Sequence, residues 1–277
     1  MKKNERAAAI VRTIVVSLIA VLFVVPLVWM VLSSLKTAPE VFARPFHWLP
    51  ARVQWQNYAT VWMNEEASML RAFANTLYIA LFSIVGLMFI SSLAAYSFAK
   101  INFKGKQVVF MLFLSSMMVP SQLTIIPRFM LFKTIGLYNN LWAIILPAFF
   151  GATSIFMLRQ FYMGLPNDLI EAAKIDGAGH LRIFLRIMLP LTKAALMSLI
   201  ILAFISSWNE YMAPLIFLVK KELYTVSQNI QWYMLDEFKE HNLTMAAATS
   251  AIVPVVILFI VGQKYFVEGI ATSGVKG

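Results

Sequence analysis

Few residues in this sequence have side chains suited to catalysis. Cysteine is absent, and only three histidines and 13 acidic residues occur among 277 residues. The absence of cysteine excludes a thiol nucleophile, a cysteine-based zinc site and an iron–sulfur site. Gly105-Lys106 is followed by Gln107 and lacks the upstream glycine of a phosphate-binding loop. We therefore predict that the chain is not an enzyme by itself and that it holds no cofactor or metal.

The most unusual acidic residue is Glu210, which lies inside a long apolar stretch. An ionisable side chain in such a place is costly in lipid and is a functional candidate by default. Trp208, Asn209 and Tyr211 flank it, and aromatic faces with amide and carboxylate groups suit a carbohydrate. One interpretation assigns these four residues to a translocation pathway or gate. The other is structural: Glu210 caps an unwound turn or bridges to a second subunit.

The composition indicates which kind of fold must position these residues. Apolar residues make up 60% of the chain and charged residues 13%, and the mean hydropathy is +0.76. A soluble domain is about one-quarter charged, and it cannot hide so much apolar side chain in one core. These figures exclude a disordered chain, a nucleic-acid-binding globule and a disulfide-stapled secreted domain. They indicate an all-α integral membrane protein.

Six apolar stretches are long enough to cross a bilayer, which takes about 20 residues as a helix. The predicted spans are 13–35, 72–99, 107–127, 134–158, 194–219 and 241–263. The first is longer than a signal-peptide core and no small-x-small cleavage site follows it, so we interpret it as a retained anchor. Residues 1–277 are predicted to form a single transmembrane domain.

The placement of the basic residues predicts the orientation of these spans. Six spans put both termini on one side, and the segments on that side hold 14 of the 23 Lys and Arg residues but only 5 of the 13 acidic ones. Basic residues favour cytoplasmic segments, so both termini are predicted to be cytoplasmic. The net charge of +10 then reflects topology and not a nucleic-acid partner.

Two long segments are predicted to lie outside, 36–71 and 220–240. The first carries Trp48, Trp55 and Trp62 among several phenylalanines and prolines. Aromatic residues of this kind lie at the headgroup level of a bilayer, which indicates a surface-lying or re-entrant cover. The segment is equally suited to docking an external partner, and the two interpretations are compatible.

The largest inner segment, 159–193, predicts a helix–glycine–helix hairpin over 164–191. Asp168 can cap a short helix, with Glu171 completing a capping box. Gly177 can end that helix in the left-handed conformation. A second helix is predicted to start near His180, with apolar residues at helical spacing, namely Leu181, Phe184, Leu185 and Met188. Such a hairpin suits a groove on a partner protein or the bilayer surface, and spacing alone leaves both open.

The hairpin resembles the EAA loop of permease subunits of binding-protein-dependent ABC importers. The shared residues are Glu171-Ala172-Ala173, Asp176-Gly177-Ala178, Phe184, Ile187 and Leu189-Pro190-Leu191. Ala194 departs from the family pattern, which often has proline there. Stretches from about residue 72 to the end resemble the carbohydrate-uptake branch, in particular the second permease subunit of maltose-type systems. They are Ser91–Tyr96, Phe98, Met118–Pro120, Ile126-Pro127, Gly136–Asn139, Ser207–Tyr211, Pro214-Leu215, Gln263–Ile270 and Gly274–Gly277.

The resemblance implies the type I permease fold of ABC importers and a set of partners in a bacterial or archaeal cell (inner) membrane. These are a second homologous permease subunit, two cytoplasmic ATPase subunits that bind ATP and magnesium, and an extracytoplasmic solute-binding protein. The helix that starts at the EAA residues would seat in a groove of the ATPase, and the C-terminal tail would reach toward the ATPase dimer. The implied ATPase-coupling residues are Glu171, Ala172, Ala173, Asp176 and Gly177.

The predicted function is a permease subunit of an ATP-driven sugar importer that works by alternating access, with an oligosaccharide as the expected solute. A polyol or a glycerol phosphate stays open as the solute. An ion-coupled secondary transporter is a different class, and it would show several intramembrane carboxylates or paired broken helices. A membrane scaffold would not need the EAA hairpin.

Overall fold

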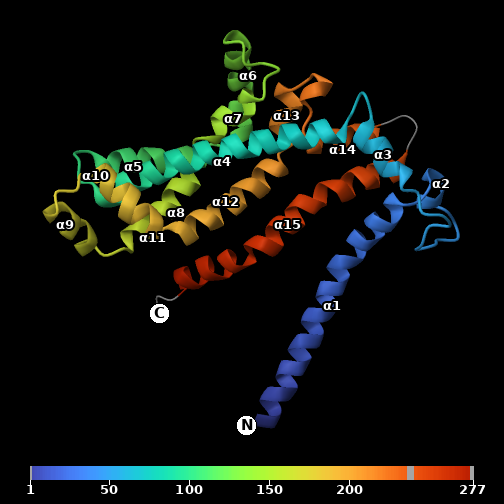
Figure 1. Cartoon of the computed structure of the whole chain (residues 1–277), viewed down its shortest axis with the longest axis horizontal. Coiled ribbons are helices and arrows are strands. Elements are labelled where there is room, and N and C mark those ends of the chain that lie inside the picture. Colours follow the sequence, from blue (N-terminus) through green and yellow to red (C-terminus); the bar gives the residue numbers. More distant parts are fainter. Residues whose placement is uncertain (1, 236–239, 275–277) are drawn as a thin grey trace. The chain divides into compact units, whose positions relative to one another are not determined.

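The computed structural model describes residues 2–235 and 240–274, with side chains described for 8–235 and 240–263 (Figure 1). All regular elements in these ranges are helical. Residues 275–277 of the predicted ATPase-directed tail lie outside the described residues. The chain divides into two compact units. One comprises the residues up to Leu70 with Asn229–Val253, and the other Arg71–Gln228 with the residues from Pro254 onward.

The first unit contains the N-terminal helix, three short helices and the start of the last long helix. These are α1 (Lys2–Ser34), α2 (Ala38–Val41), α3 (Gln56–Met63), the end of α14 (Val226–Leu235) and the first part of α15 (His241–Gly274). The span Ala8–Ser34 has a mean hydropathy of 2.9, and none of its most apolar window is buried. Its apolar side chains therefore require lipid or another protein around them.

A polar core joins the end of α1 to α3 and α15 in this unit. Lys36 is almost fully buried, and its ammonium group donates to the carbonyl oxygen of His47. The Asn57 amide donates to the carbonyl oxygens of Ser34 and Lys36, each at 2.8 Å. Asn242 donates to Asn57 Oδ1 at 3.0 Å. These bonds compensate the burial of polar groups and hold the start of segment 36–71 in a defined conformation.

Glu40 lies in the short helix α2 and its side chain caps the start of that helix. Its carboxylate accepts hydrogen bonds from the backbone N–H and the hydroxyl of Thr37, both at 2.9 Å, and from the N–H of Ala51 at 3.3 Å. The bond from the Thr37 backbone has the largest effect in lowering the pKa of Glu40 below its ordinary value, because it stabilises the ionised form.

The second unit contains most of the predicted spans. Its elements are α4 (Met69–Lys100), α5 (Lys106–Ser115), η1 (Ser116–Met118), η2 (Ser121–Thr124), α6 (Ile125–Thr134), α7 (Trp142–Ala148), α8 (Ala152–Met163), α9 (Asp168–Ile175), α10 (His180–Ile183), the π-helical turn η3 (Phe184–Met188), α11 (Leu189–Leu191), α12 (Lys193–Trp208), α13 (Met212–Phe217) and η4 (Lys221–Leu223), followed by the start of α14. The hairpin with α9 and α10 lies at one end of α4, away from α6 and α13 (Figure 1).

Within the described residues, four helices are long and apolar enough to cross a membrane. Two further helix pairs pass together but are bent, by 91° between Lys106–Met118 and Ser121–Thr134, and by 75° between His180–Leu191 and Lys193–Trp208. The count reaches six if each bent pair is one span, which agrees with the six spans predicted from the sequence.

The bounds of three spans differ from the sequence prediction. The predicted helix 107–127 is interrupted at Val119-Pro120, where Val119 is extended and proline lacks the N–H that a continuing helix needs. The fourth span runs over Trp142–Met163 instead of 134–158. The predicted helix 194–219 ends at Trp208, and a separate short helix, α13, follows. Apolar composition predicted the stretches well but could not show these breaks.

Candidate functional site

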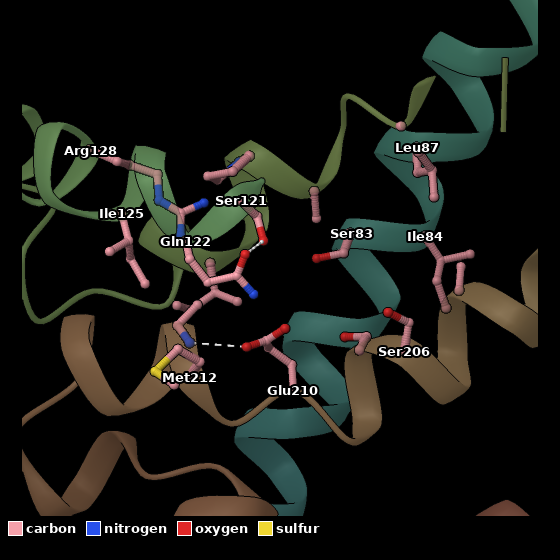
Figure 2. A pocket seen from close by; sticks show the side chains of 17 residues that line it. Ser83, Ile84, Leu87, Ser121, Gln122, Ile125, Arg128, Ser206, Glu210 and Met212 are labelled. Atoms are coloured by element: carbon pink, nitrogen blue, oxygen red, sulfur yellow. Dashed lines mark hydrogen bonds between the residues drawn. The ribbon is translucent and has the colours of Figure 1, made fainter. Parts of the chain in front are cut away.

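A cavity of about 420 Å³ lies in the second unit, between α4, the η2–α6 segment, α7 and the junction of α12 with α13. Figure 2 shows its lining, with Ser83, Gln122 and Glu210 directed toward a common space. The polar residues of the lining are Ser83, Ser121, Gln122, Arg128, Ser206, Ser207 and Glu210. A concave site with a few convergent polar groups among apolar ones is a typical small-molecule site.

Glu210 reaches this cavity because α12 ends two residues before it. The backbone at Asn209 is no longer in a regular helix, and α13 begins at Met212 with Pro214 in its first turn. Proline costs little there, since the first N–H groups of a helix have no intrahelical partner. Glu210 Oε1 accepts a hydrogen bond from the backbone N–H of Ala213 at 3.0 Å. Glu210 thus caps an unwound turn and also lines the cavity.

The other three predicted pathway residues lie elsewhere. Trp208 is buried, and its ring packs edge-on against Phe73 at 5.3 Å and stacks with Phe204 at 5.4 Å. The exposed Asn209 donates back to the carbonyl oxygen of Ile205 at 2.8 Å. Tyr211 is half-buried and is not part of the cavity lining. The structure therefore does not bring the four residues together around one space.

Arg128 is a cavity residue that the sequence reasoning missed. It follows the predicted span 107–127 by one position, in a short segment that the predicted topology places outside. In the structure it lies on α6, with its guanidinium 5.0 Å from the centre of the Phe217 ring. It is close enough to Glu210 for an electrostatic interaction. Its nearness to the end of an apolar stretch was the only signal in the sequence.

Two polar atoms of the cavity residues are buried without a hydrogen-bond partner in the described part of the chain. They are Nε of Arg128 and the hydroxyl oxygen of Ser83. Burying such a group without a partner costs about 1–3 kcal/mol. Both atoms are closed off from solvent, so pairing with water or a polar ligand requires the side chain to turn toward the cavity.

The predicted hairpin forms the second candidate site, and its first helix starts differently from the prediction. The N-cap residue is Asn167 and not Asp168, and no side chain caps α9 there, so the capping box of Asp168 and Glu171 is wrong. The Asn167 side chain does not cap α9 because its Oδ1 accepts a hydrogen bond from Lys100 Nζ at 2.6 Å. Lys100 also donates to the carbonyl oxygen of Leu165 at 2.7 Å.

The end of this helix agrees with the prediction. Gly177 has a φ of +76°, the left-handed conformation that favours glycine. The N–H of Ala178 donates to the carbonyl oxygen of Ala173 at 2.9 Å. The N–H of Gly177 donates to the carbonyl oxygen of Lys174 at 3.0 Å. This is the bond pair of a Schellman cap. The chain then turns and begins α10 at His180.

The four apolar residues predicted for the second helix of the hairpin divide between two environments. Phe184 and Met188 are buried within the chain, whereas Leu181 is 65% exposed and Leu185 is 51% exposed. Ile183, which the prediction omitted, is fully buried. A π-helical turn over Phe184–Met188 also shifts the facing of the side chains within it relative to an α-helical repeat.

A compact core fixes the hairpin to the membrane helices of its unit. Ile170 and Ala173 of α9 belong to the same buried cluster as Ile155 and Leu158 of α8 and Leu199 of α12. Tyr96 of α4 and His180 of α10 add a polar contact, with 3.1 Å between the Tyr96 hydroxyl and Nδ1 of His180. Packed cores transmit displacement instead of absorbing it, so α9 is suited to move with α4, α8 and α12.

The five predicted ATPase-coupling residues divide between two faces of this hairpin. Glu171, Ala172, Asp176 and Gly177 are exposed. Ala173 is 8% exposed and packs into the buried cluster beneath α9. Four of the five are therefore available to a partner, while Ala173 allows α9 to approach its own core closely.

Residues 87–272 match the model of the family described as binding-protein-dependent transport system inner membrane component. The match covers most of the chain and includes the hairpin and the cavity lining except Ser83 and Ile84. The chain belongs to this family. Membership supports a membrane-embedded permease. Two bent helix pairs are a feature also expected of a secondary transporter, but membership in this family argues against that class.

Relatives of the same kind align with nearly the whole chain. The arabinooligosaccharides transport system permease protein AraQ of Bacillus subtilis is 33% identical over 96% of this chain and 95% of its own length. The sn-glycerol-3-phosphate transport system permease protein UgpE of Pectobacterium atrosepticum is 30% identical over 94% of each. The chain is thus similar to transport permease subunits.

A solved structure confirms the predicted fold class. A crystal structure of a bacterial ABC transporter involved in the import of the acidic polysaccharide alginate contains a chain of the same fold, with a TM-score of 0.84 over 95% of this chain and 98% of that chain. The sequence identity is 24%. The all-helical permease architecture predicted from the apolar stretches and the EAA residues is therefore correct.

Proposed function

We propose that the chain is one of two permease subunits of an ATP-driven, binding-protein-dependent importer of saccharides, with an oligosaccharide as the expected solute. The observation that carries this proposal is the hairpin with α9, which is fixed to the membrane helices by a buried cluster and exposes Glu171 and Ala172. Family membership and the names of relatives such as AraQ support it.

The proposed mechanism is alternating access driven by a partner ATPase. Closure of two ATPase subunits around ATP and magnesium would move α9 as a rigid lever, because the Schellman cap at Gly177 and the core below Ala173 leave little room for local bending. The motion would pass to α8 and α12 and tilt this subunit against a second, homologous permease subunit. The solute shifts this equilibrium only through its different affinity for the two states.

The same proposal assigns the remaining partners and the orientation. Both termini and the hairpin face the cytoplasm of a bacterial or archaeal cell, and segments 36–71 and 220–240 face outward, where a solute-binding protein docks. The distribution of basic residues supports this orientation. A polyol or glycerol phosphate is the second candidate solute, and the relative UgpE favours it.

Uptake measurements in cells with separate control of ATP and the proton gradient test this function. We expect uptake to stop when ATP is depleted while the proton gradient is maintained. Uptake that persists under these conditions would show an ion-coupled transporter and overturn the proposal.

A further inference from the structure

We propose that this subunit itself binds the transported solute, in the cavity bounded by Ser83, Arg128 and Glu210, and that the group bound there is an uncharged polyhydroxy group of a saccharide. The inference rests on the proposed import function and adds a binding site and a ligand class to it. It follows from three properties of the cavity: its hydrogen-bonding groups, its charge and its volume.

The hydrogen-bonding groups of the cavity are complementary to hydroxyl groups. Arg128 can only donate, and its Nε has no partner in the described chain. Glu210 can only accept when ionised, and one of its oxygens already accepts from Ala213 while the carboxylate faces the cavity. Ser83 can do both, and its hydroxyl has no partner either. A sugar hydroxyl donates and accepts at once, so it can pair with all three once Arg128 and Ser83 turn their buried polar atoms toward the cavity.

The charge of the cavity argues for an uncharged ligand. Arg128 and Glu210 are the two charged residues of the lining as the structure describes it, and they carry opposite signs. They come from separate elements, α6 and the α12–α13 junction, and no hydrogen bond or ion pair joins them within the described chain. A phosphate or carboxylate group would gain an attraction to Arg128 but would meet the repulsion of Glu210. A neutral hydroxylated group meets no such opposition.

The volume and the surface of the cavity agree with this ligand class. About 420 Å³ falls within the range of about 300–1,000 Å³ that is typical of small-molecule sites. The remaining lining is largely aliphatic, from residues such as Ile84, Leu87 and Ile144. Aliphatic surface can pack against the carbon skeleton of a sugar ring while the polar groups bind its hydroxyls.

The test uses the complete importer, with its partner subunits and binding protein, reconstituted in lipid vesicles. The probes are raffinose and arabinotriose, which are uncharged, and sn-glycerol 3-phosphate, which is anionic. Two quantities are measured together: solute transported, and ATP hydrolysed in response to the loaded binding protein. Their ratio separates a defect in solute binding from a defect in assembly or coupling.

The variants are R128Q and E210Q. Glutamine at position 210 can still accept the hydrogen bond from Ala213, so E210Q removes the charge and leaves the cap of α13 in place. We expect both variants to lower the solute transported per ATP about tenfold, with ATP hydrolysis within about twofold of the unmodified importer. K133Q, on the exposed side of the same helix as Arg128, is the matched control and should transport normally.

S83A and R128K are milder variants in case a charge change prevents assembly. Each should still lower solute per ATP about two- to fivefold. An unchanged ratio in every assembled cavity variant would overturn the proposal, as would an importer that carries sn-glycerol 3-phosphate but neither neutral saccharide. An importer without any ATP-dependent uptake would instead refute the proposed function.

Discussion

The hairpin around α9 and the cavity around Glu210 differ in how their residues come together. The hairpin is local, since its cap, its turn and both its helices lie within about 25 consecutive residues. The cavity draws Ser83, Arg128 and Glu210 from three separated parts of the chain. The hairpin is also fixed by a buried cluster and by a hydrogen-bonded turn at Gly177, whereas the cavity is lined by polar side chains from separate elements.

This difference suits the two regions to different roles in one subunit. A lever has to be stiff, and a buried cluster with a fully bonded helix end supplies stiffness. A site that receives a solute has to keep unsatisfied polar groups in reach, at a cost in stability. The predictions below compare the two regions, and they follow from the largest expected effect to the smallest.

The largest effect is expected from Glu171→Lys on the exposed face of α9. The substitution reverses an exposed charge without touching the buried cluster. We expect ATP-dependent uptake and co-purification of the ATPase to fall at least about tenfold, while helix content by circular dichroism is unchanged. Glu171→Gln should give a smaller loss, because it removes the charge without reversing it. Normal uptake by Glu171→Lys would refute a coupling role for this face.

A smaller effect is expected from Gly177→Ser, with Gly179→Ser as its matched control. A side chain meets open space at both positions, but only Gly177 has a positive φ. The left-handed conformation costs a serine about 1–2 kcal/mol. Hydrogen exchange of the α9 amides should therefore rise about five- to tenfold or more in Gly177→Ser and stay nearly unchanged in Gly179→Ser. Equal exchange in the two variants would show that the turn does not fix the lever.

Lys100→Met should loosen the start of α9 by less. The variant keeps a long side chain but loses the hydrogen bonds to Leu165 and Asn167. Because the lysine is partly exposed, we expect a loss of about 1 kcal/mol in the local opening free energy of α9. Hydrogen exchange at 168–171 measures it, and amides lining the cavity in α12 serve as the reference. A change of the same size in both places would mean that the two regions are not independent.

The smallest effect is expected at Glu40, which belongs to neither region. Its pKa is lowered in the folded state, so its contribution to stability is complete above the ordinary value near 4.5 and is lost as the pH falls through the lowered pKa. Unfolding of the first unit, followed by the fluorescence of its tryptophans, should show a slight acid dependence that Glu40→Gln removes. An acid dependence that persists in Glu40→Gln would have to come from another group.

The sequence predicted the parts of this molecule that depend on local pattern or on composition. The hairpin, the left-handed Gly177 and the start of α10 agree with the structure, and so do the six apolar stretches if each bent helix pair is one span. The EAA residues identified the family because they form one continuous motif. Composition therefore sufficed for the all-α membrane class and local spacing for the hairpin, while the coupling role assigned to the hairpin came from the family resemblance.

The remaining features depend on contacts between distant residues or on small departures from helix geometry. The second helix of the hairpin buries Ile183 against distant helices and leaves Leu181 and Leu185 exposed, which the spacing alone did not show. The bend after Met118 turned the segment that carries Arg128 toward Glu210, and no local pattern indicates that approach. Asn167 and not Asp168 precedes the first residue of α9, and its side chain binds Lys100, 67 residues earlier, instead of capping the helix.

The central claim is that the exposed face of α9 meets the ATPase. Because the chain contains no cysteine, a single introduced thiol is the only one it carries. Ala172 is exposed and its neighbour Ala173 is buried against the chain's own core, so the two alanines form a matched pair. In the assembled importer, Ala172→Cys should cross-link to an ATPase subunit through a short thiol-reactive linker, and Ala173→Cys should not. Failure of Ala172→Cys to cross-link in an importer that still transports, or equal cross-linking at both positions, would contradict the account.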